Sequence, residues 1–397
     1  MIHYRWLLLF GVWLLYASFG FVATSLAPVA ALIIADLQMT HAEMGLTMGA
    51  WQLTYIAAAI PGGILLDKIG TRRALSLGAL LMGASAVARA LAVDTQTMVA
   101  AVMLFGLGGP IISAGAPKVV LANFDGPLRG QAMGIYITGP AIGGIVSLTL
   151  TNSVLLPAFE DSWRQVMMLW AGVCFAAAAS WYLLAAKQPE IATAESTTGG
   201  SQLKIIGNLL SQSTVLVVLG MSVCVFMFNH GLGNWMPELL KAMGKDAITA
   251  GYWAAIPTVI GIFASLIIPR FATPERRIYV LMLLGLAAFA ATLLLRFDQP
   301  QSLVLGLFLQ GVARSTLMTV LILTLVELPE IGERYAGVAS GIFFSAAEIG
   351  GVLGPLLMGI LYIPGQGFGD GLWLLTAITL CFIVGAQILI GRLRAST

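Results

Sequence analysis

Twelve apolar segments, each long enough to cross a lipid bilayer as a helix, follow one another along the chain. A helix needs about 20 apolar residues to span a membrane, and only helices and closed barrels satisfy every backbone hydrogen bond inside lipid. The segments are too long for barrel strands, so they predict an all-α membrane protein. The predicted spans are residues 7–33, 43–66, 74–92, 98–122, 130–156, 166–186, 207–232, 247–270, 277–296, 302–326, 334–361 and 371–391.

The amino-acid composition excludes most other classes of protein. Charged residues make up 10% of the chain, whereas soluble domains carry about 25%. Cys174, Cys224 and Cys381 all lie within apolar segments and form no disulfide framework or metal-ligand cluster. The sequence contains no nucleophile elbow, phosphate loop or Walker motif. We therefore expect neither an enzyme nor an ATP-driven pump, and no metal, cofactor or nucleic-acid partner.

The basic residues of the loops predict how the chain is oriented in the membrane. Cytoplasmic loops of membrane proteins are enriched in Lys and Arg. With both termini inside the cell, 13 of the 20 Lys and Arg residues fall on the cytoplasmic side, five fall outside and two lie within spans. We therefore predict a multi-pass protein of the cytoplasmic (inner) membrane with both termini in the cytoplasm.

The chain also divides into two halves. A polar stretch at 187–206 is rich in Ser, Thr and Gly, a composition that indicates a flexible linker. We predict an N-terminal bundle of six helices at 1–186, a cytoplasmic linker at 187–206, and a C-terminal bundle of six helices at 207–397.

An internal repeat relates these two bundles. The stretch "AIGGIVSLTLTNSVLLP" (141–157) aligns with "EIGGVLGPLLMGILYIP" (348–364), so that Gly143 corresponds to Gly350 at an offset of 207 positions. Transporters built from parallel repeats place their substrate site near the membrane midplane, at the interface of the two halves. We expect the same arrangement here.

Residues 62–75, "GGILLDKIGTRRAL", connect the second and third predicted spans. This stretch resembles the corresponding loop of the major facilitator superfamily, whose pattern is G-x-L-a-D-r-x-G-r-k-x-x-L. Thr71 departs from the pattern, because a basic residue is usual at that position. The stretch "DGPLRGQAMG" (125–134) likewise resembles the family's loop between spans four and five. The resemblance implies a gating role for Gly63, Asp67, Lys68, Gly70, Arg72, Arg73 and Arg129.

The chemistry of this loop fits a latch on the cytoplasmic side. Glycines allow two helices to turn tightly and to pack closely. A carboxylate such as that of Asp67 can accept hydrogen bonds from basic side chains or from the N-terminus of an approaching helix. For the basic residues alone, an ordinary solvated loop on the positive side of the membrane remains an equal alternative.

The resemblance covers the whole chain and implies a secondary active transporter that works by alternating access. The stretches "GNWMPELLKAMG" (233–244) and "IIPRFATPERR" (267–277) look most like the cyanate and nitroimidazole permease-like branch of the family. The stretch "GIYITGPAIGG" (134–144) resembles instead the span-five motif of drug/proton antiporters. Its glycines and Pro140 have a structural interpretation as well, because they allow close packing and a kink.

Arg314 lies almost at the midpoint of the tenth predicted span, where a guanidinium costs about 3 kcal/mol. Gln310 shares its helix face, four residues earlier. In the family that this chain resembles, spans one, four, seven and ten line the central cavity. Glu348, near the middle of span eleven, stands where the repeat has Ala141. We expect it either to form a static ion pair with Arg314 or to take up and release a coupling proton.

Other polar and aromatic residues are further candidates for binding the substrate. The stretch "FNHGLGNWMP" (228–237) is predicted to interrupt span seven and to expose polar groups to a cavity. Lys118 is predicted to extend toward the cytoplasmic interface. The remaining candidates for substrate binding are Asn229, His230, Asn234, Tyr16, Trp51, Gln52, Tyr55 and Tyr136.

Taken together, the sequence predicts a monomeric secondary transporter, embedded in the lipid bilayer, for a small organic or inorganic anion. Its transport is expected either to be coupled to protons, which would make the protein a symporter, or to proceed by exchange. The alternative is a drug/proton antiporter that exports amphipathic compounds. A receptor-like homologue of a transporter remains a third interpretation, which a flux measurement would separate from the other two.

Overall fold

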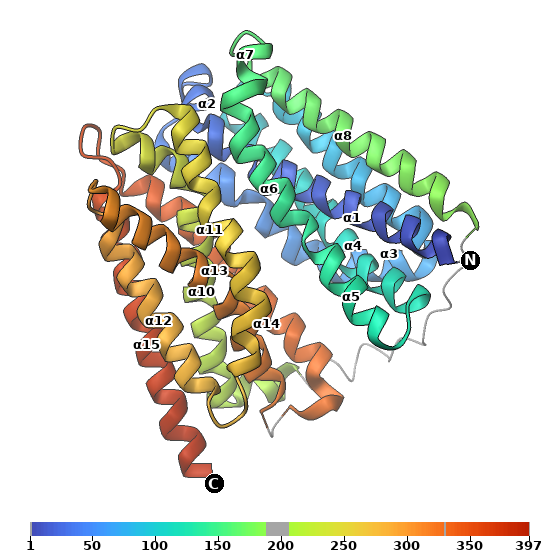
Figure 1. Ribbon diagram of the computed structural model, residues 1–397, viewed down its shortest axis with the longest axis vertical. Helices are drawn as coiled ribbons and strands as arrows, with labels where there is room; N and C mark the ends of the chain where they lie inside the picture. The colour runs from blue at the N-terminus through green and yellow to red at the C-terminus, as the bar shows by residue number, and fades with distance from the viewer. Residues whose placement is uncertain (1, 188–205, 329–330, 397) are drawn as a thin grey trace. The chain divides into compact units, whose positions relative to one another are not determined.

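The computed structural model describes residues 2–187, 206–328 and 331–396, and almost all of them lie in helices (Figure 1). The one β-bridge found in these residues joins Ile363 to Gly367. The first part of the chain forms α1 (Ile2–Thr24), η1 (Ala27–Val29), α2 (Ala30–Asp36), α3 (His41–Ala90), α4 (Thr95–Asn123), α5 (Gly126–Ile137), α6 (Gly139–Leu150), η2 (Thr151–Leu155), α7 (Leu156–Ala158), α8 (Trp163–Leu184) and η3 (Ala185–Lys187).

The second part forms α10 (Ser213–Ala242), α11 (Ala247–Ile267), η4 (Ile268–Phe271), α12 (Arg277–Leu294), α13 (Pro300–Val326), α14 (Gly332–Ile360) and α15 (Gly369–Ser396). In the described residues, 11 helical segments are long and apolar enough to cross a membrane. One of them, His41–Ala90, contains both the second and the third predicted span. The prediction of an all-α membrane protein is therefore confirmed.

Two predicted spans are not single regular helices. The first ends as α1 at Thr24 and continues after a bend as η1 and α2, with Pro28 in the short 3₁₀ turn. The fifth is built from α5, α6, the π-helical η2 and α7, with Thr138 at the junction before Gly139 and Pro140. A proline has no N–H to donate within a helix, so its position explains the interruption beside Thr138.

Contacts divide the chain into two compact units. Unit 1 contains Met1–Ala194 and Met236–Ala255, and unit 2 contains Glu195–Trp235 and Ile256–Thr397. The linker predicted at 187–206 lies outside the described residues except for its first and last positions. The bundle boundaries at 186 and 207 remain predictions.

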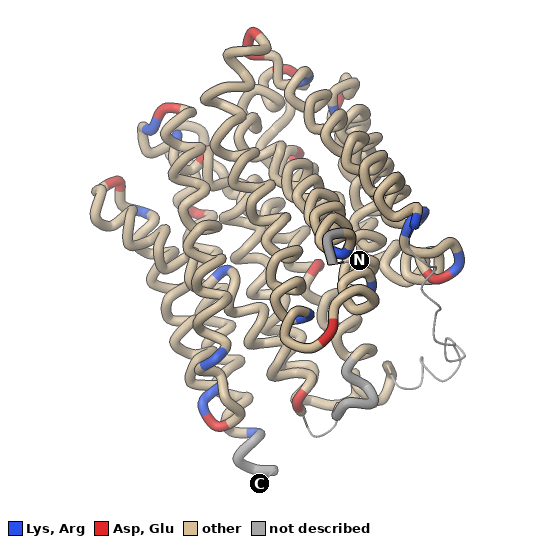
Figure 2. Tube along the Cα trace, turned by 45° about the vertical axis from the view of Figure 1, so that its right-hand side comes forward, with Lys and Arg blue, Asp and Glu red and all other residues tan. Residues whose placement is uncertain are grey.

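Each unit has its own helix packing. In unit 1, α1 packs against α6 and α8, and α3 packs against α4 and α8. In unit 2, α12 packs against α13 and α15, and α13 also contacts α14. Most charged residues lie near the ends of the helices and in their connections, while the middle stretches are largely uncharged (Figure 2). This distribution is what burial of the middle stretches in lipid requires.

The internal repeat is visible in how the helices pack within each unit. A Cβ atom added at Gly143 of α6 would lie 2.2 Å from the Ala17 carbonyl oxygen of α1. A Cβ atom added at Gly350 of α14 would lie 2.1 Å from the Val223 carbonyl oxygen of α10. Two positions that the sequence aligns therefore make the same backbone-to-backbone approach, one in each unit.

Candidate functional site

Arg314, on α13 in unit 2, has few hydrogen-bond partners for a charged group in the middle of an apolar helix. Its Nη1 donates one long hydrogen bond, 3.4 Å, to Thr258 Oγ1 of α11. The guanidinium lies against Gly233 of α10, where an added Cβ would be 3.3 Å from Nη2. A larger residue at 233 would displace the guanidinium, so the glycine makes room for it.

Three of the predicted ligands lie on α10 beside this arginine. Asn229 Nδ2 donates to the Arg314 carbonyl oxygen at 3.0 Å. His230 is the next residue on α10, and its ring lies 5.4 Å from that of Phe226. Asn234 bonds back to its own helix, from Nδ2 to the His230 carbonyl oxygen at 2.9 Å. The structure therefore brings Asn229 to Arg314, whereas the amide donor of Asn234 is used within its helix.

The predicted interruption of span seven is wrong. Helix α10 continues from Ser213 to Ala242 through Gly231, Gly233 and Pro237. The glycines serve close packing: an added Cβ at Gly231 would lie 3.4 Å from Met358 of α14, and Gly233 lies against Arg314. A glycine-rich sequence predicts either a break or a close approach, and here the close approach is what forms.

Gln310 and Glu348 are both buried in unit 2, with exposed fractions of 0% and 6%. Both amide atoms of Gln310, and Oε2 of Glu348, bond to no other group in the described part of the chain. The ion pair between Arg314 and Glu348 that the sequence suggested does not form between these two described residues. Arg314 therefore has no acidic partner among the described residues.

The predicted aromatic candidates gather in unit 1. The ring of Tyr16 lies 5.5 Å from that of Tyr136 and 6.3 Å from that of Phe19. Trp51 is 5.8 Å from both Phe19 and Tyr55, in edge-to-face geometry. Gln52, the neighbour of Trp51, is fully buried. This group, which we call the aromatic cluster (Tyr16, Phe19, Trp51, Tyr55, Phe105 and Tyr136), joins α1, α3, α4 and α5.

The motif at 62–75 is built around one glycine and one ion pair. Gly70 has φ 76° and ψ 162°, which lets the chain turn between two helices that are otherwise continuous. That region of backbone space is essentially restricted to glycine. Asp67 forms an ion pair with Lys118 of α4, and about two-fifths of each side chain remains exposed. The prediction that Lys118 only extends to the interface missed this pairing, because the two residues are 51 positions apart.

The other residues predicted for gating are Arg72, Arg129, Lys68, Arg73 and Gly63, and they make few contacts between helices. Arg72 donates from Nε to the Tyr182 carbonyl oxygen at 2.9 Å and lies 4.0 Å from the Tyr182 ring, which ties α3 to α8. Arg129 bonds within its own turn, to Asp125 at 3.1 Å. Lys68 and Arg73 are exposed, and an added Cβ at Gly63 would meet nothing within 4 Å. Among these predicted gating residues, therefore, only Asp67 and Arg72 connect different helices through charge.

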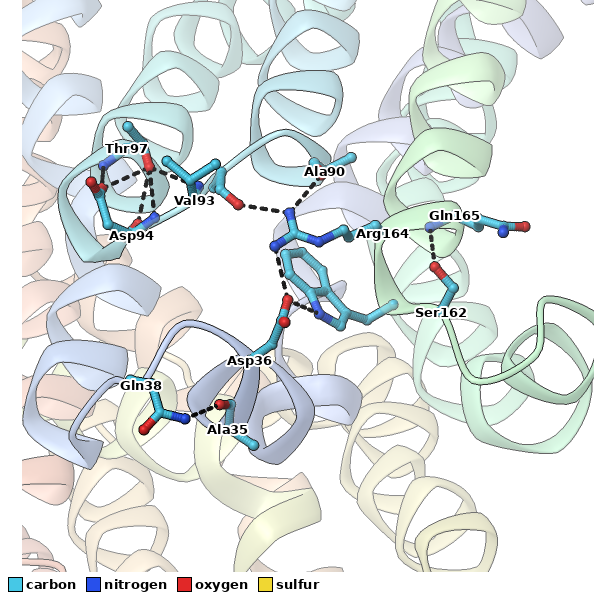
Figure 3. A network of polar contacts seen from close by, with 12 residues as sticks. Ala35, Asp36, Gln38, Ala90, Val93, Asp94, Thr97, Ser162, Arg164 and Gln165 are labelled. Carbon is cyan, nitrogen blue, oxygen red and sulfur yellow. Dashed lines mark hydrogen bonds and ion pairs between the residues drawn. The ribbon is translucent and has the colours of Figure 1, made fainter.

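Two arginines that the sequence assigned to the outer side of the membrane, Arg164 and Arg89, prove to be connecting groups. Arg164 donates to the carbonyl oxygens of Ala90 and Ala92 at 2.8 and 2.6 Å and to Asp36 Oδ2 at 2.8 Å (Figure 3). The indole Nε1 of Trp163 donates to the same Asp36 oxygen at 3.1 Å. This network ties α2, the end of α3 and the start of α8 together. No spacing in the sequence predicts it, since its members come from three helix ends that lie far apart in the chain.

Arg89 is the second of these arginines and lies at the end of α3, only 1% exposed. Its Nη1 donates to the Val22 carbonyl oxygen at 2.8 Å and to Ser25 Oγ at 3.2 Å. The guanidinium carbon lies 5.4 Å from the centre of the Phe105 ring. The sequence counted Arg89 as a loop cation, but it is a buried cross-link between α1 and α3.

Comparison with known proteins relates the whole arrangement to membrane transporters. A family model described as Major Facilitator Superfamily matches residues 12–355. The chain is 22% identical to the hexuronate transporter of Bacillus subtilis (strain 168), over 89% of this chain and 86% of that protein. It is 23% identical to a quinolone resistance transporter of Acinetobacter baumannii, over 90% and 87%.

A third relative bears on the branch that the seventh and eighth spans suggested. The cyanate transport protein CynX of Escherichia coli (strain K12) is 25% identical, over 57% of this chain and 56% of that protein. Among solved structures, the nucleoside transporter NupG superposes with a TM-score of 0.81, at 14% identity, over 96% of this chain and 99% of that one. At that identity the likeness concerns the fold alone.

Proposed function

Since the chain belongs to the major facilitator superfamily, we propose that it carries a small anionic solute across the cytoplasmic membrane by alternating access. The family and the relatives make it a secondary transporter and an integral multi-pass membrane protein rather than an enzyme. The anionic character of the solute, the coupling ion and the orientation are the proposed part.

The observation that carries the proposal is the incomplete coordination of Arg314. An uncompensated guanidinium inside a membrane protein is costly. In the described residues it has one 3.4 Å hydrogen bond and no acidic partner. A bound anion supplies the missing charge, and the planar fork of an arginine can bind a carboxylate through two parallel hydrogen bonds. Asn229 contacts Arg314 and His230 follows it on α10, so they join Arg314 and Gln310 as the proposed ligands in unit 2.

The names of two relatives support an anion. Hexuronate and cyanate are both anions, and the proteins that carry these names align over 89% and 57% of this chain. The quinolone resistance transporter supports instead the alternative, a drug/proton antiporter.

The antiporter-like stretch at 134–144 has a sufficient structural explanation. Within it, added Cβ atoms at Gly139 and Gly143 would collide with the backbone of α1. Gly350 makes the same approach to α10 in unit 2, where no such motif occurs. Because helix packing accounts for these glycines in both units, we place anion transport ahead of drug export.

Glu348 is the proposed site of proton coupling. Its carboxyl is buried and has one oxygen without a partner in the described residues. A carboxyl that no arginine holds ionised is free to change its protonation during a transport cycle. We expect Glu348→Gln to bind the solute but to lose its response to a proton gradient.

The remaining parts of the proposal follow from the sequence. The protein is a monomer with both termini in the cytoplasm. Its two six-helix bundles, joined by the linker at 187–206, open the solute site to one side of the membrane and then to the other. The aromatic cluster and Gln52 supply the N-terminal side of the binding region. Asp67, with its partner Lys118, forms part of the cytoplasmic latch.

A thermal-shift screen of the purified protein against organic anions, inorganic anions, amphipathic cations and neutral solutes tests the proposal. A ligand that binds only the folded state raises its stability. We expect stabilisation by anions, followed by uptake of the same anion into proteoliposomes. Stabilisation by cations alone would contradict the proposal and favour drug export. Binding without flux would indicate a receptor-like protein.

A further inference from the structure

The groups around Arg314 offer more than a positive charge. The Arg314 carbonyl oxygen can only accept a hydrogen bond, so Asn229 must present its NH₂ group to it, as the 3.0 Å contact shows. The orientation of the Asn229 amide is therefore fixed, and its Oδ1 atom is left over. That oxygen is buried and bonds to no protein group in the described residues.

Gln310 adds a second set of unsatisfied polar atoms one turn earlier on α13. Its side chain is fully buried, and neither Oε1 nor Nε2 bonds to a described protein group. Residues four apart on a helix share a face, so Gln310 and Arg314 face the same side of α13. The neighbourhood of Arg314 therefore combines free guanidinium donors, two amide acceptors and one amide donor.

Building on the proposed function, we infer that the transported anion is a hydroxylated carboxylate, with its carboxylate on Arg314 and a hydroxyl on the amides of Asn229 and Gln310. A hydroxyl both donates and accepts, so it satisfies an amide oxygen and an amide N–H. A small anion without donors, such as cyanate or propionate, satisfies Arg314 but leaves both amide oxygens without a donor.

The physical basis of this selectivity is the cost of an unpaired polar atom. A buried acceptor that loses its partner destabilises the complex by more than an ordinary hydrogen bond contributes. Sites built to bond a substrate hydroxyl accordingly reject analogues that lack it much more strongly than apolar pockets reject a missing methylene. The structure thus favours hydroxyl-bearing acids over donor-free anions of the same charge.

The test compares lactate with propionate, two carboxylates that differ by one hydroxyl, and adds gluconate and cyanate. Binding to the full-length protein in detergent is measured by calorimetry or thermal shift. We expect lactate and gluconate to bind at least tenfold more tightly than propionate and cyanate. Gln310→Leu and Asn229→Ala should each reduce the ratio of lactate to propionate affinity toward one, mainly by weakening lactate binding.

Thr316→Val is the matched control, because Thr316 is fully buried on the same helix and its hydroxyl bonds to the Val312 carbonyl oxygen of that helix. This variant should keep the wild-type ratio. Equal affinities for lactate and propionate in the wild-type protein, or tightest binding of cyanate, would overturn the inference while leaving anion transport intact. If none of the four anions binds and cations do, anion transport itself fails.

Discussion

Each unit of this transporter holds an arginine among its helices, Arg89 buried and Arg314 partly buried, and the two differ in how they are coordinated. Arg89 in unit 1 bonds to a carbonyl oxygen at 2.8 Å and to a hydroxyl at 3.2 Å, beneath an aromatic ring. Arg314 in unit 2 has, among the residues that the structure describes, one 3.4 Å bond to a hydroxyl. Burial alone therefore does not identify a functional cation. Arg89 also has an atom without a partner, its Nε. What points to a ligand at Arg314 is its long hydrogen bond together with the unpaired amide atoms of Asn229 and Gln310.

The two units also differ in the residues that they gather, aromatic rings in unit 1 and polar side chains in unit 2. Unit 1 collects the aromatic cluster, in which Trp51 meets Phe19 and Tyr55 edge to face. Unit 2 collects amides and a carboxyl that have atoms without partners, at Asn229, Gln310 and Glu348. At the aligned repeat positions, unit 1 has Ala141 where unit 2 has Glu348. The repeat preserves the packing of the helices and lets the polar chemistry diverge.

The largest expected effect tests the shared packing. Gly143→Val and Gly350→Val each force a branched side chain against a backbone carbonyl oxygen, which would lie 2.2 or 2.1 Å from the new Cβ atom. We expect each variant to lower the free energy of unfolding by about 3 kcal/mol. Thermal unfolding in detergent measures both. A large loss of stability in one variant and none in the other would contradict the claim that Gly143 and Gly350 make the same packing contact in the two units.

Removing each arginine should give opposite results. Arg89→Met deletes a buried cross-link between α1 and α3, with its hydrogen bonds to the Val22 carbonyl oxygen and Ser25 Oγ, so stability should fall by about 2 kcal/mol. Transport per folded molecule should not change. Arg314→Met removes an uncompensated charge, so stability should hold or rise while transport is lost.

These two variants are checked by unfolding and by flux into proteoliposomes, with the amount of folded protein as the normalising quantity. If Arg314→Met unfolds the protein and Arg89→Met abolishes transport, the roles assigned to the two arginines are reversed.

A smaller effect is expected at the Asp67–Lys118 pair of unit 1. The pair is partly exposed, and such ion pairs contribute at most about 1 kcal/mol to stability. Asp67→Asn should therefore unfold almost like the wild type and bind solute normally, but transport more slowly. Lys118→Met serves as the reciprocal variant. Parallel losses of binding and transport would indicate a folding defect rather than a latch.

The smallest effect is expected at Asp94, the residue that caps the N-terminus of α4, where a change of surface charge should leave ligand binding unaffected. Asp94 lies just outside the membrane-spanning helix α4, and Thr97 donates to its Oδ1 from both N and Oγ1 at 2.8 Å. These bonds hold the pKa of Asp94 below its ordinary value. Because the pKa is lower in the folded protein, the ionised Asp94 carboxylate stabilises the fold fully above the unfolded pKa of about 4. This stabilisation is lost as the pH falls through the folded pKa.

Asp94→Asn should therefore unfold much like the wild type at neutral pH and lose less stability on acidification below about pH 4. Unfolding measured from neutral pH down to about pH 3 checks this. An effect of Asp94→Asn on anion affinity would contradict the proposal that the anion binds at Arg314 and its neighbours.

Residue patterns predicted the architecture because it depends on features that lie close together in the sequence. Long apolar segments predicted the helices, and the glycines aligned by the repeat mark where α6 and α14 meet α1 and α10. The motif at 62–75 predicted a sharp turn, and Gly70 makes it. Each of these depends on residue type and spacing alone.

Features that depend on distant contacts could not be predicted in the same way. The pairing of Asp67 with Lys118 and the Arg164 network join residues on different helices. The continuity of α10 through "FNHGLGNWMP" depends on what its glycines meet on α13 and α14. For the same reason the sequence offered Glu348 as the partner of Arg314, although the two side chains form no ion pair.

The most direct test of the account measures anion binding to three proteins: the wild type, Arg314→Lys and Arg89→Lys. The anion is the carboxylate that stabilises the wild type most in the thermal-shift screen. Lysine keeps the charge but loses the planar fork, so we predict that Arg314→Lys folds and binds at least tenfold more weakly, a loss of about 1.4 kcal/mol. Arg89→Lys should bind like the wild type. Wild-type affinity in Arg314→Lys would contradict the claim that Arg314 binds the transported anion.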